Sequence, residues 1–287
     1  MNSKNYLSIY AKSFNWSGFF LPKKIYRKCS ILYDFCRTID NIADQNVDLE
    51  IRKKELEEFK KKFEQKNTNN IIIKNMWDLM NEINISKKIV DDLFDGVNSD
   101  LKKEVRIKTE KELLVYSYRV AGTVGLMMAK IFGIEKKDSL HRAIDLGIAM
   151  QLTNIARDVV EDEKKNRIYL IKSSNDVFKS IKNIILKAES FYDSSFVGIK
   201  DIPLNSRFSI IVARRVYRQI GKKILEKKNI ESYRKAGKIY VSNFGKIIQT
   251  LFSLKDLIIL FFTKKKKYEK ELEYNLINED IGLNERI

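Results

Sequence analysis

Apolar residues recur every three or four positions along most of the chain, a period typical of amphipathic α-helices rather than strands. The first clear case follows Pro22, which suits the first turn of a helix, and has apolar positions at Ile25, Cys29, Leu32 and Cys36. The same period predicts further helices at residues 47–65, 71–83, 86–97, 113–133, 139–163, 175–196 and 205–228. We therefore expect an all-α protein.

The composition agrees with a single helical domain. The 287 residues include only 11 glycines and 2 prolines, too few for the many turns of a strand-rich or Rossmann-type fold. With 44% hydrophobic residues, the chain is able to bury a large core. No linker divides it, so residues 1–287 are expected to form one domain. No apolar run reaches the ~18 residues of a membrane-spanning helix, and the N-terminus lacks a signal-peptide core, which makes the cytoplasm the default location.

The formal charge of +17 suggests an anionic partner. Two readings stay open: a bias toward lysine on polar helix faces throughout the chain, or attraction of a polyanion. No nucleic-acid-binding module is recognisable, so we expect no nucleic-acid partner. The excess charge would still help to attract a polyanionic small molecule.

Histidine and cysteine chemistry is poorly supported. His141 is the only histidine, which argues against Ser-His-Asp or Cys-His catalysis and against a His-based zinc site. Cys29 and Cys36 lie seven positions apart on one predicted helix and do not suggest a disulfide framework. Any chemistry is therefore expected to depend on carboxylates and a metal ion.

Two of the predicted helices carry a polar stripe on an otherwise apolar sequence. Spacings of three and four residues place side chains on one helix face. Each stripe ends in a DxxxD pair, and an arginine precedes an aspartate in both. A single DxxxD pair is typical of an exposed helix face, but two copies inside apolar helices favour a shared site. The stripes comprise Tyr33, Arg37, Asp40 and Asp44, and Gln151, Asn154, Asp158 and Asp162.

Carboxylates that face a helical interior repel one another unless they are paired or bind a metal ion. Mg²⁺ typically takes one or two carboxylates, waters and phosphate oxygens, so the two stripes predict a site for Mg²⁺ and a diphosphate. Such a site suits ionisation of an allylic diphosphate, whose carbocation needs an apolar wall that excludes water. Candidates for that wall, each equally typical of an ordinary core, are Phe14, Tyr33, Tyr116, Val120 and Ala121.

The helix predicted at residues 113–133 contains Gly122 and Gly125. Glycine within a helix costs about 1 kcal/mol relative to alanine. The pair therefore indicates close packing, a bend, or a ligand that approaches the backbone.

The C-terminal segment, residues 246–287, differs from the rest. Residues 247–267 are strongly apolar and end in four lysines, Lys264 to Lys267. They predict either an amphipathic helix at a membrane interface or a core helix that ends in a solvated charge run. Beyond Tyr268 the mixture of acidic and basic residues predicts a frayed end.

The stripes belong to a larger set of motifs that resembles the squalene/phytoene synthase family of head-to-head prenyl synthases, and most closely its bacterial phytoene synthases. The similarity extends over residues 10–245, approximately, in the family's order. The second aspartate motif, with the RIYL that follows it, is the most specific piece. The matching segments are AKSF, YDFCRTIDNIAD, LFDGVNSDL, YSYRVAGTVG, LGIAMQLTNIARDVVEDEKKNRIYL and ARRVYRQI.

The resemblance implies an isoprenoid synthase-type helical bundle around a central cavity, with a role for each matching residue. Asp40, Asp44, Asp158 and Asp162 would bind Mg²⁺, for which Mn²⁺ is a substitute, with Asn154 as an added ligand and Gln151 beside it. Arg37, Arg157 and Tyr217 match positions that contact diphosphate, and Lys12 and Ser13 match an N-terminal pair near a diphosphate. Phe14, Tyr33 and Tyr116 match cavity residues near the reacting carbons, and Val120 and Ala121 remain candidates for the wall.

Two positions depart from the family pattern. Lys238 stands where many members have an arginine, so the charge is kept but the bidentate geometry is lost. Gly18 stands where an aromatic residue often lines the cavity, which would enlarge one end of it.

The implied activity is phytoene synthesis from two geranylgeranyl diphosphates through prephytoene diphosphate. The alternative is dehydrosqualene or squalene synthesis from two farnesyl diphosphates, with NADPH only for squalene. A third hypothesis, a non-catalytic scaffold, would be expected to have lost acidic residues from the motifs, whereas all four aspartates are present. The hydrophobic product and the C-terminal segment predict a peripheral membrane contact.

Overall fold

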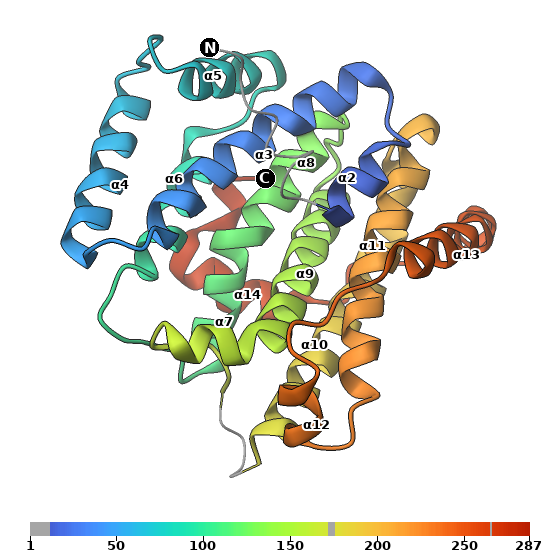
Figure 1. Ribbon diagram of the computed structural model, residues 1–287. Helices are drawn as coiled ribbons and strands as arrows, with labels where there is room; N and C mark the ends of the chain where they lie inside the picture. Colours follow the sequence, from blue (N-terminus) through green and yellow to red (C-terminus); the bar gives the residue numbers. More distant parts are fainter. Residues whose placement is uncertain (1–11, 172–175, 265) are drawn as a thin grey trace.

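The computed structural model describes residues 12–171, 176–264 and 266–287. Its described residues form helices almost throughout, joined by short turns, as the apolar period predicts (Figure 1). In chain order the first helices are α2 (Lys12–Gly18), α3 (Lys23–Asp44), α4 (Leu49–Glu64), α5 (Ile71–Ile83) and α6 (Lys87–Ser99). The C-terminal half contains α10 (Val177–Gly198), η2 (Ile199–Asp201), α11 (Leu204–Leu225), α12 (Ile230–Lys235), α13 (Asn243–Phe262), α14 (Glu271–Ile281) and η3 (Leu283–Glu285).

Helix α9 (Lys137–Lys164) is the axis of the bundle. It packs against α10 and α11 on one side and against α8 (Thr123–Ile131) on the other, and α3 crosses in front of this group (Figure 1). Every residue from 139 to 150 is buried or partly buried, because the helix is covered on several sides. The second stripe thus lies at the C-terminal end of the most enclosed helix.

The helix predicted at residues 113–133 is three elements rather than one. Helix α7 (Glu110–Ser117) begins at a capping box between Thr109 and Glu112. It continues through a π-helical turn, η1 (Tyr118–Gly122), into α8. Such turns often occur at functional sites, and here the turn supplies part of the wall described below. Periodicity alone does not show it, because every segment stays apolar.

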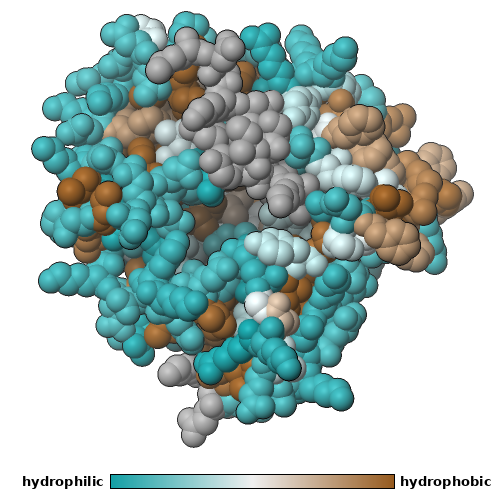
Figure 2. All heavy atoms as spheres, in the orientation of Figure 1, coloured by the Kyte–Doolittle hydropathy of each residue, from teal (hydrophilic) through white to brown (hydrophobic). Residues whose placement is uncertain are grey.

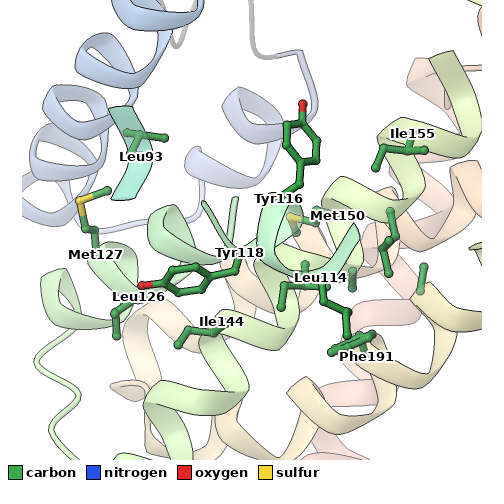
Figure 3. Close-up of a cluster of buried hydrophobic side chains, with 14 of the residues drawn as sticks. Leu93, Leu114, Tyr116, Tyr118, Leu126, Met127, Ile144, Met150, Ile155 and Phe191 are labelled. Carbon is green, nitrogen blue, oxygen red and sulfur yellow. The ribbon is translucent and has the colours of Figure 1, made fainter. Parts of the chain in front are cut away.

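The glycines of this region allow two helix backbones to touch. A Cβ atom added to Gly125 would lie 2.2 Å from the carbonyl oxygen of Ala143, and one added to Gly147 would lie 2.2 Å from that of Ala121. Of the three readings of the glycine pair, close packing is therefore shown. The surrounding core includes the fully buried Tyr118, in a cluster seen in Figure 3.

Two features were not expected from the sequence. Residues 105–106 (β1, Val105–Arg106) and 167–168 (β2, Arg167–Ile168) form a short parallel pair. The prediction of a frayed end beyond Tyr268 is wrong: α14 and η3 follow, with Ile277, Ile281 and Leu283 buried. Their apolar residues are too few for a clear period, but they pack against α7.

Candidate active site

A cavity of about 320 Å³ lies within the bundle. Its lining comes from α2, α3, α6, η1, α8, α9, α10, η2 and α11, and most of it is apolar. Characteristic wall residues are Leu21, Leu93, Val120, Met128, Met150 and Ile202. A wall of this kind suits a long hydrocarbon chain and excludes water.

Polar side chains gather where α3, α9 and α11 meet. Tyr33, Asp40, Gln151, Asn154 and Tyr217 all line the cavity there. Burial raises the pKa of Tyr33 to about 12 and also raises the pKa of Tyr217. Both hydroxyl groups therefore stay neutral and remain able to donate a hydrogen bond to an anion.

The two aspartates of the first motif lie in different environments. The side chain of Asp40 is exposed to the cavity, yet the protein around it removes enough water that desolvation raises its pKa to about 7, although the charge of Arg37 acts in the opposite direction. Asp44 accepts a hydrogen bond from Arg167 Nη1 at 2.9 Å and pairs with Lys165 Nζ at 3.2 Å. Burial acts to raise the pKa of Asp44, but these two cations outweigh it and the pKa is lowered.

The two aspartates of the second motif also lie in different environments. Arg157 donates from Nε to Asp158 Oδ1 at 2.7 Å and from Nη2 to Oδ2 at 2.5 Å. Lys238 Nζ lies 3.2 Å from the same carboxylate. Asp162 has no salt bridge in the described part of the chain, and burial together with the charge of Asp158 raises its pKa to about 7. Each motif thus has one compensated and one uncompensated carboxylate.

Asp100 lies between the motifs. It accepts hydrogen bonds from the hydroxyl groups of Tyr116 at 2.9 Å and Tyr169 at 2.6 Å, and burial raises its pKa. Its charge acts on both Asp40 and Asp162, which shows that the structure brings the two stripes to one place. No sequence pattern assigns Asp100 a role. Its only signal was a position within LFDGVNSDL.

The oxygen donors that remain fit a divalent metal ion. Asn154 Nδ2 donates to Gln151 Oε1 at 3.3 Å, but no described residue hydrogen-bonds to the buried Oδ1 of Asn154. Asp40 and Asp162 are likewise uncompensated. Among the described residues no three carboxylate, histidine or cysteine groups are close enough to enclose a metal ion alone. Mg²⁺ does not require such a cage, because it usually keeps waters and binds substrate phosphate oxygens.

Comparison with known proteins agrees with this geometry. Residues 8–171 match the family described as squalene/phytoene synthase. The chain belongs to the squalene/phytoene synthase family. It is 30% identical over 247 residues to a 15-cis-phytoene synthase of Pantoea ananas. The aligned region covers 76% of this chain and 80% of the relative. It is 39% identical over 140 residues to a 15-cis-phytoene synthase of Enterobacter agglomerans, 43% of this chain and 48% of the relative, so the match spans about half the length of that protein.

The fold of the family is also found among solved structures. A dehydrosqualene synthase in complex with a ligand superposes with a TM-score of 0.74 at 25% identity, over 90% of this chain and 95% of that one. The expectation of an all-α isoprenoid synthase fold is therefore confirmed.

In this squalene/phytoene synthase family member, some of the residues that the sequence predicts for the cavity wall line the cavity, and one does not. Tyr33, Val120 and Ala121 line the cavity. Tyr116 does not. It stacks on Tyr169, with ring centroids 4.7 Å apart, and its hydroxyl group is bound to Asp100. The side chains of Lys12, Ser13 and Phe14 lie outside the described residues.

The basic residues expected at the diphosphate site are close to the motifs. Arg37 and Arg157 lie one helical turn or less from Asp40 and Asp158, and Tyr217 lines the cavity near Arg157 and Asp158. Lys238 pairs with Asp158 and, at 2.5 Å, with Glu161. The lysine therefore places a positive charge beside the second motif.

Proposed function

We propose that this squalene/phytoene synthase family member is a phytoene synthase. Two geranylgeranyl diphosphates would condense head to head to prephytoene diphosphate, with loss of one diphosphate and one proton. Ionisation and rearrangement of that intermediate would give phytoene, with loss of the second diphosphate and another proton. The observation that carries the proposal is the meeting of two aspartate motifs beside an apolar cavity.

Asp40 and Asp162, with Asn154 Oδ1, are the residues that would hold Mg²⁺ in this protein. Bound Mg²⁺ supplies positive charge that stabilises the departing diphosphate. Asp44 and Asp158 complete the set of four carboxylates once their present cationic partners turn to the substrate. Arg157 in particular has a planar fork that matches phosphate oxygens as well as it matches Asp158.

The chain's own side chains would perform the remaining tasks. Arg37, Arg157 and Tyr217 bind the diphosphate and orient it, and Tyr33 lies near the reacting carbons. Val120 and Ala121 belong to the apolar wall that keeps water from the carbocation. Tyr116 would act indirectly, because its hydroxyl group donates a hydrogen bond to Asp100 between the two motifs. Lys12 and Ser13 are proposed to bind a diphosphate, and Phe14 to lie near the reacting carbons.

The proposed chain length of the substrate rests on the relatives. Both relatives described above are named 15-cis-phytoene synthase. Gly18 lines the cavity, and a Cβ atom added there would already lie 2.9 Å from the ring of Tyr26. The ring of Tyr26 therefore already occupies the space beside Gly18, so the glycine does not by itself lengthen the cavity as the sequence suggested. The alternative, a dehydrosqualene or squalene synthase acting on farnesyl diphosphate, is supported by the solved dehydrosqualene synthase fold. NADPH would enter only for squalene.

We also propose that the protein binds peripherally to a membrane through α13. Its exposed apolar side chains include Phe244, Leu251, Leu254, Ile258, Phe261 and Phe262, whereas Ser253 and Leu260 face inward. Figure 2 shows this apolar surface at the side where Figure 1 places α13. Lys264, Lys266 and Lys267 are exposed just beyond the helix. An apolar face flanked by lysines suits an interface with anionic lipid.

Within the described residues, none of the helices combines the length and the apolarity that a membrane crossing requires.

Release of diphosphate tests the proposed reaction. Purified protein would be incubated with geranylgeranyl diphosphate and Mg²⁺, without NADPH, and diphosphate and hydrocarbon would be counted. Two diphosphates per hydrocarbon are expected. Release of one diphosphate per prenyl alcohol, with no coupled product, would show simple hydrolysis and contradict the proposal.

A further inference from the structure

A second hollow, of about 600 Å³, is lined in part by Tyr116, whose hydroxyl group donates a hydrogen bond to Asp100. It is formed by β1 with its flanking residues, by α7 and η1, and by Asp280 of α14. It shares no lining residue with the central cavity. Neither the family motifs nor the proposed reaction assigns it a role.

Arg119, from the π-helical turn η1, is the most unusual residue of this hollow. Its side chain is partly buried, and its Nε atom is buried without a hydrogen-bond partner. No residue that the structure describes forms an ion pair with its guanidinium group. An unpaired buried donor is costly, and the guanidinium group, which lines the hollow and has no ion pair among the described residues, is available to an anion from solution. The next residue of the same turn, Val120, lines the central cavity.

The other charges of the hollow leave a positive excess. Lys102 and Lys108 are exposed, and the described residues provide neither amino group with an ion pair. The acidic groups are already engaged. Glu104 pairs with Arg106 at 2.6 Å, Asp280 pairs with Lys111 at 2.8 Å, and Glu112 caps α7 by accepting from the backbone N–H of Lys108 at 2.7 Å.

We propose that this hollow binds a phosphate-type anion of the inorganic diphosphate class, with Arg119 as its anchor and Lys102 and Lys108 as additional cations. A guanidinium group binds two phosphate oxygens at once, and an ammonium group binds phosphate as a point charge. Three uncompensated cations match a multivalent anion better than a carboxylate. The anion would be diphosphate released by the neighbouring site, an identity that rests on the proposed function, or free phosphate.

Calorimetric titration of the full chain in EDTA tests this proposal, because removal of divalent metal weakens binding at the aspartate motifs. Sodium diphosphate and sodium phosphate would be titrated separately into the wild type, Arg119→Gln and Arg37→Gln. We expect Arg119→Gln to weaken the binding of diphosphate on the order of tenfold or more, while Arg37→Gln, in the central site, retains the Arg119-dependent binding. Whichever anion binds more tightly, diphosphate or phosphate, is identified as the ligand.

A wild type that binds neither anion in EDTA, or an Arg119→Gln variant that binds as the wild type does, would overturn the proposal. If Arg119→Gln fails to fold, as judged by circular dichroism, the exposed pair Lys102→Gln and Lys108→Gln takes its place, with a loss of binding expected and Lys62→Gln as the control. Turnover of geranylgeranyl diphosphate would be measured in parallel. Turnover without anion binding refutes this inference alone, whereas anion binding without turnover refutes the proposed function alone.

Discussion

Arg286 forms a bidentate ion pair with the buried Asp92: Nε lies 3.0 Å from Oδ2, and Nη2 lies 3.1 Å from Oδ1. The same carboxylate accepts a hydrogen bond from the hydroxyl group of Tyr118 at 3.0 Å. Tyr118 begins the π-helical turn that supplies Val120 and Ala121 to the cavity. The C-terminal residues are thus joined through α6 to the wall of the site.

We expect Arg286→Leu to lower the free energy of unfolding by about 3 kcal/mol, because Asp92 would be left as a buried charge without its cation. Asp92→Asn in the same chain should restore much of the loss. Denaturant titration measures both. Lys88→Gln is the matched control, since it breaks the exposed pair with Glu285 and should cost less than about 1 kcal/mol. Equal effects of Arg286→Leu and Lys88→Gln would contradict the account.

Asp145 predicts a dependence of stability on pH. It is buried in α9 and accepts hydrogen bonds from Ser194 at 2.6 Å and Tyr268 at 2.9 Å, yet burial raises its pKa from 3.8 to about 7. Between these pH values the folded protein keeps a proton that the unfolded chain has released, so ionisation reduces stability as the pH rises. We expect the free energy of unfolding of the wild type to fall relative to that of Asp145→Asn from about pH 4 to about pH 7. A difference that does not change with pH would refute this.

The uncompensated carboxylates predict the most sensitive positions for turnover. Asp40→Asn and Asp162→Asn should each lower kcat by about 100-fold or more, because each would remove a proposed metal ligand. Steady-state kinetics with Mg²⁺ measures this, and circular dichroism checks the fold. Glu163→Gln, beside Asp162 but exposed, should have little effect. EDTA should abolish turnover of the wild type and Mg²⁺ should restore it. Normal rates in either aspartate variant would refute the metal assignment.

The membrane proposal predicts loss of liposome binding on substitution in α13. Phe261→Ser with Phe262→Ser removes two largely exposed rings that form no part of the core, so the fold should persist. Co-sedimentation with anionic liposomes should fall by about tenfold. Leu272→Ser, an equally exposed apolar position on α14, is the control. Unchanged binding in the α13 variant would show that this helix is not the contact. Substitution is preferable to truncation, because Arg142 donates to the carbonyl oxygens of Lys266 and Lys267.

The sequence predicts the helices and the two stripes well, because a period of three or four residues is a local property. The sequence does not show that Asp44 and Asp158 have cationic partners whereas Asp40 and Asp162 have none among the described residues. Arg167 and Lys238 reach the motifs from distant segments, β2 and the segment after α12.

The position of Tyr116 and the order of the C-terminal end also depend on tertiary contacts, which local sequence patterns do not reveal. Tyr116 was expected at the cavity because it lies on an apolar helix, but its stacking on Tyr169 and its bond to Asp100 place it beside the motifs instead. The C-terminal end was expected to fray because its sequence mixes charges. The C-terminal end is held by contacts with residues far away in the sequence, such as the ion pair between Arg286 and Asp92, and no local pattern reveals these contacts.

The central claim is the head-to-head condensation of two twenty-carbon prenyl diphosphates. Its most direct test is mass spectrometry of the hydrocarbon formed by purified protein with Mg²⁺ from geranylgeranyl diphosphate and farnesyl diphosphate, offered separately with and without NADPH. We expect phytoene from geranylgeranyl diphosphate, with no requirement for NADPH. A thirty-carbon product from farnesyl diphosphate, with none from geranylgeranyl diphosphate, would contradict the account and place the protein among the dehydrosqualene and squalene synthases.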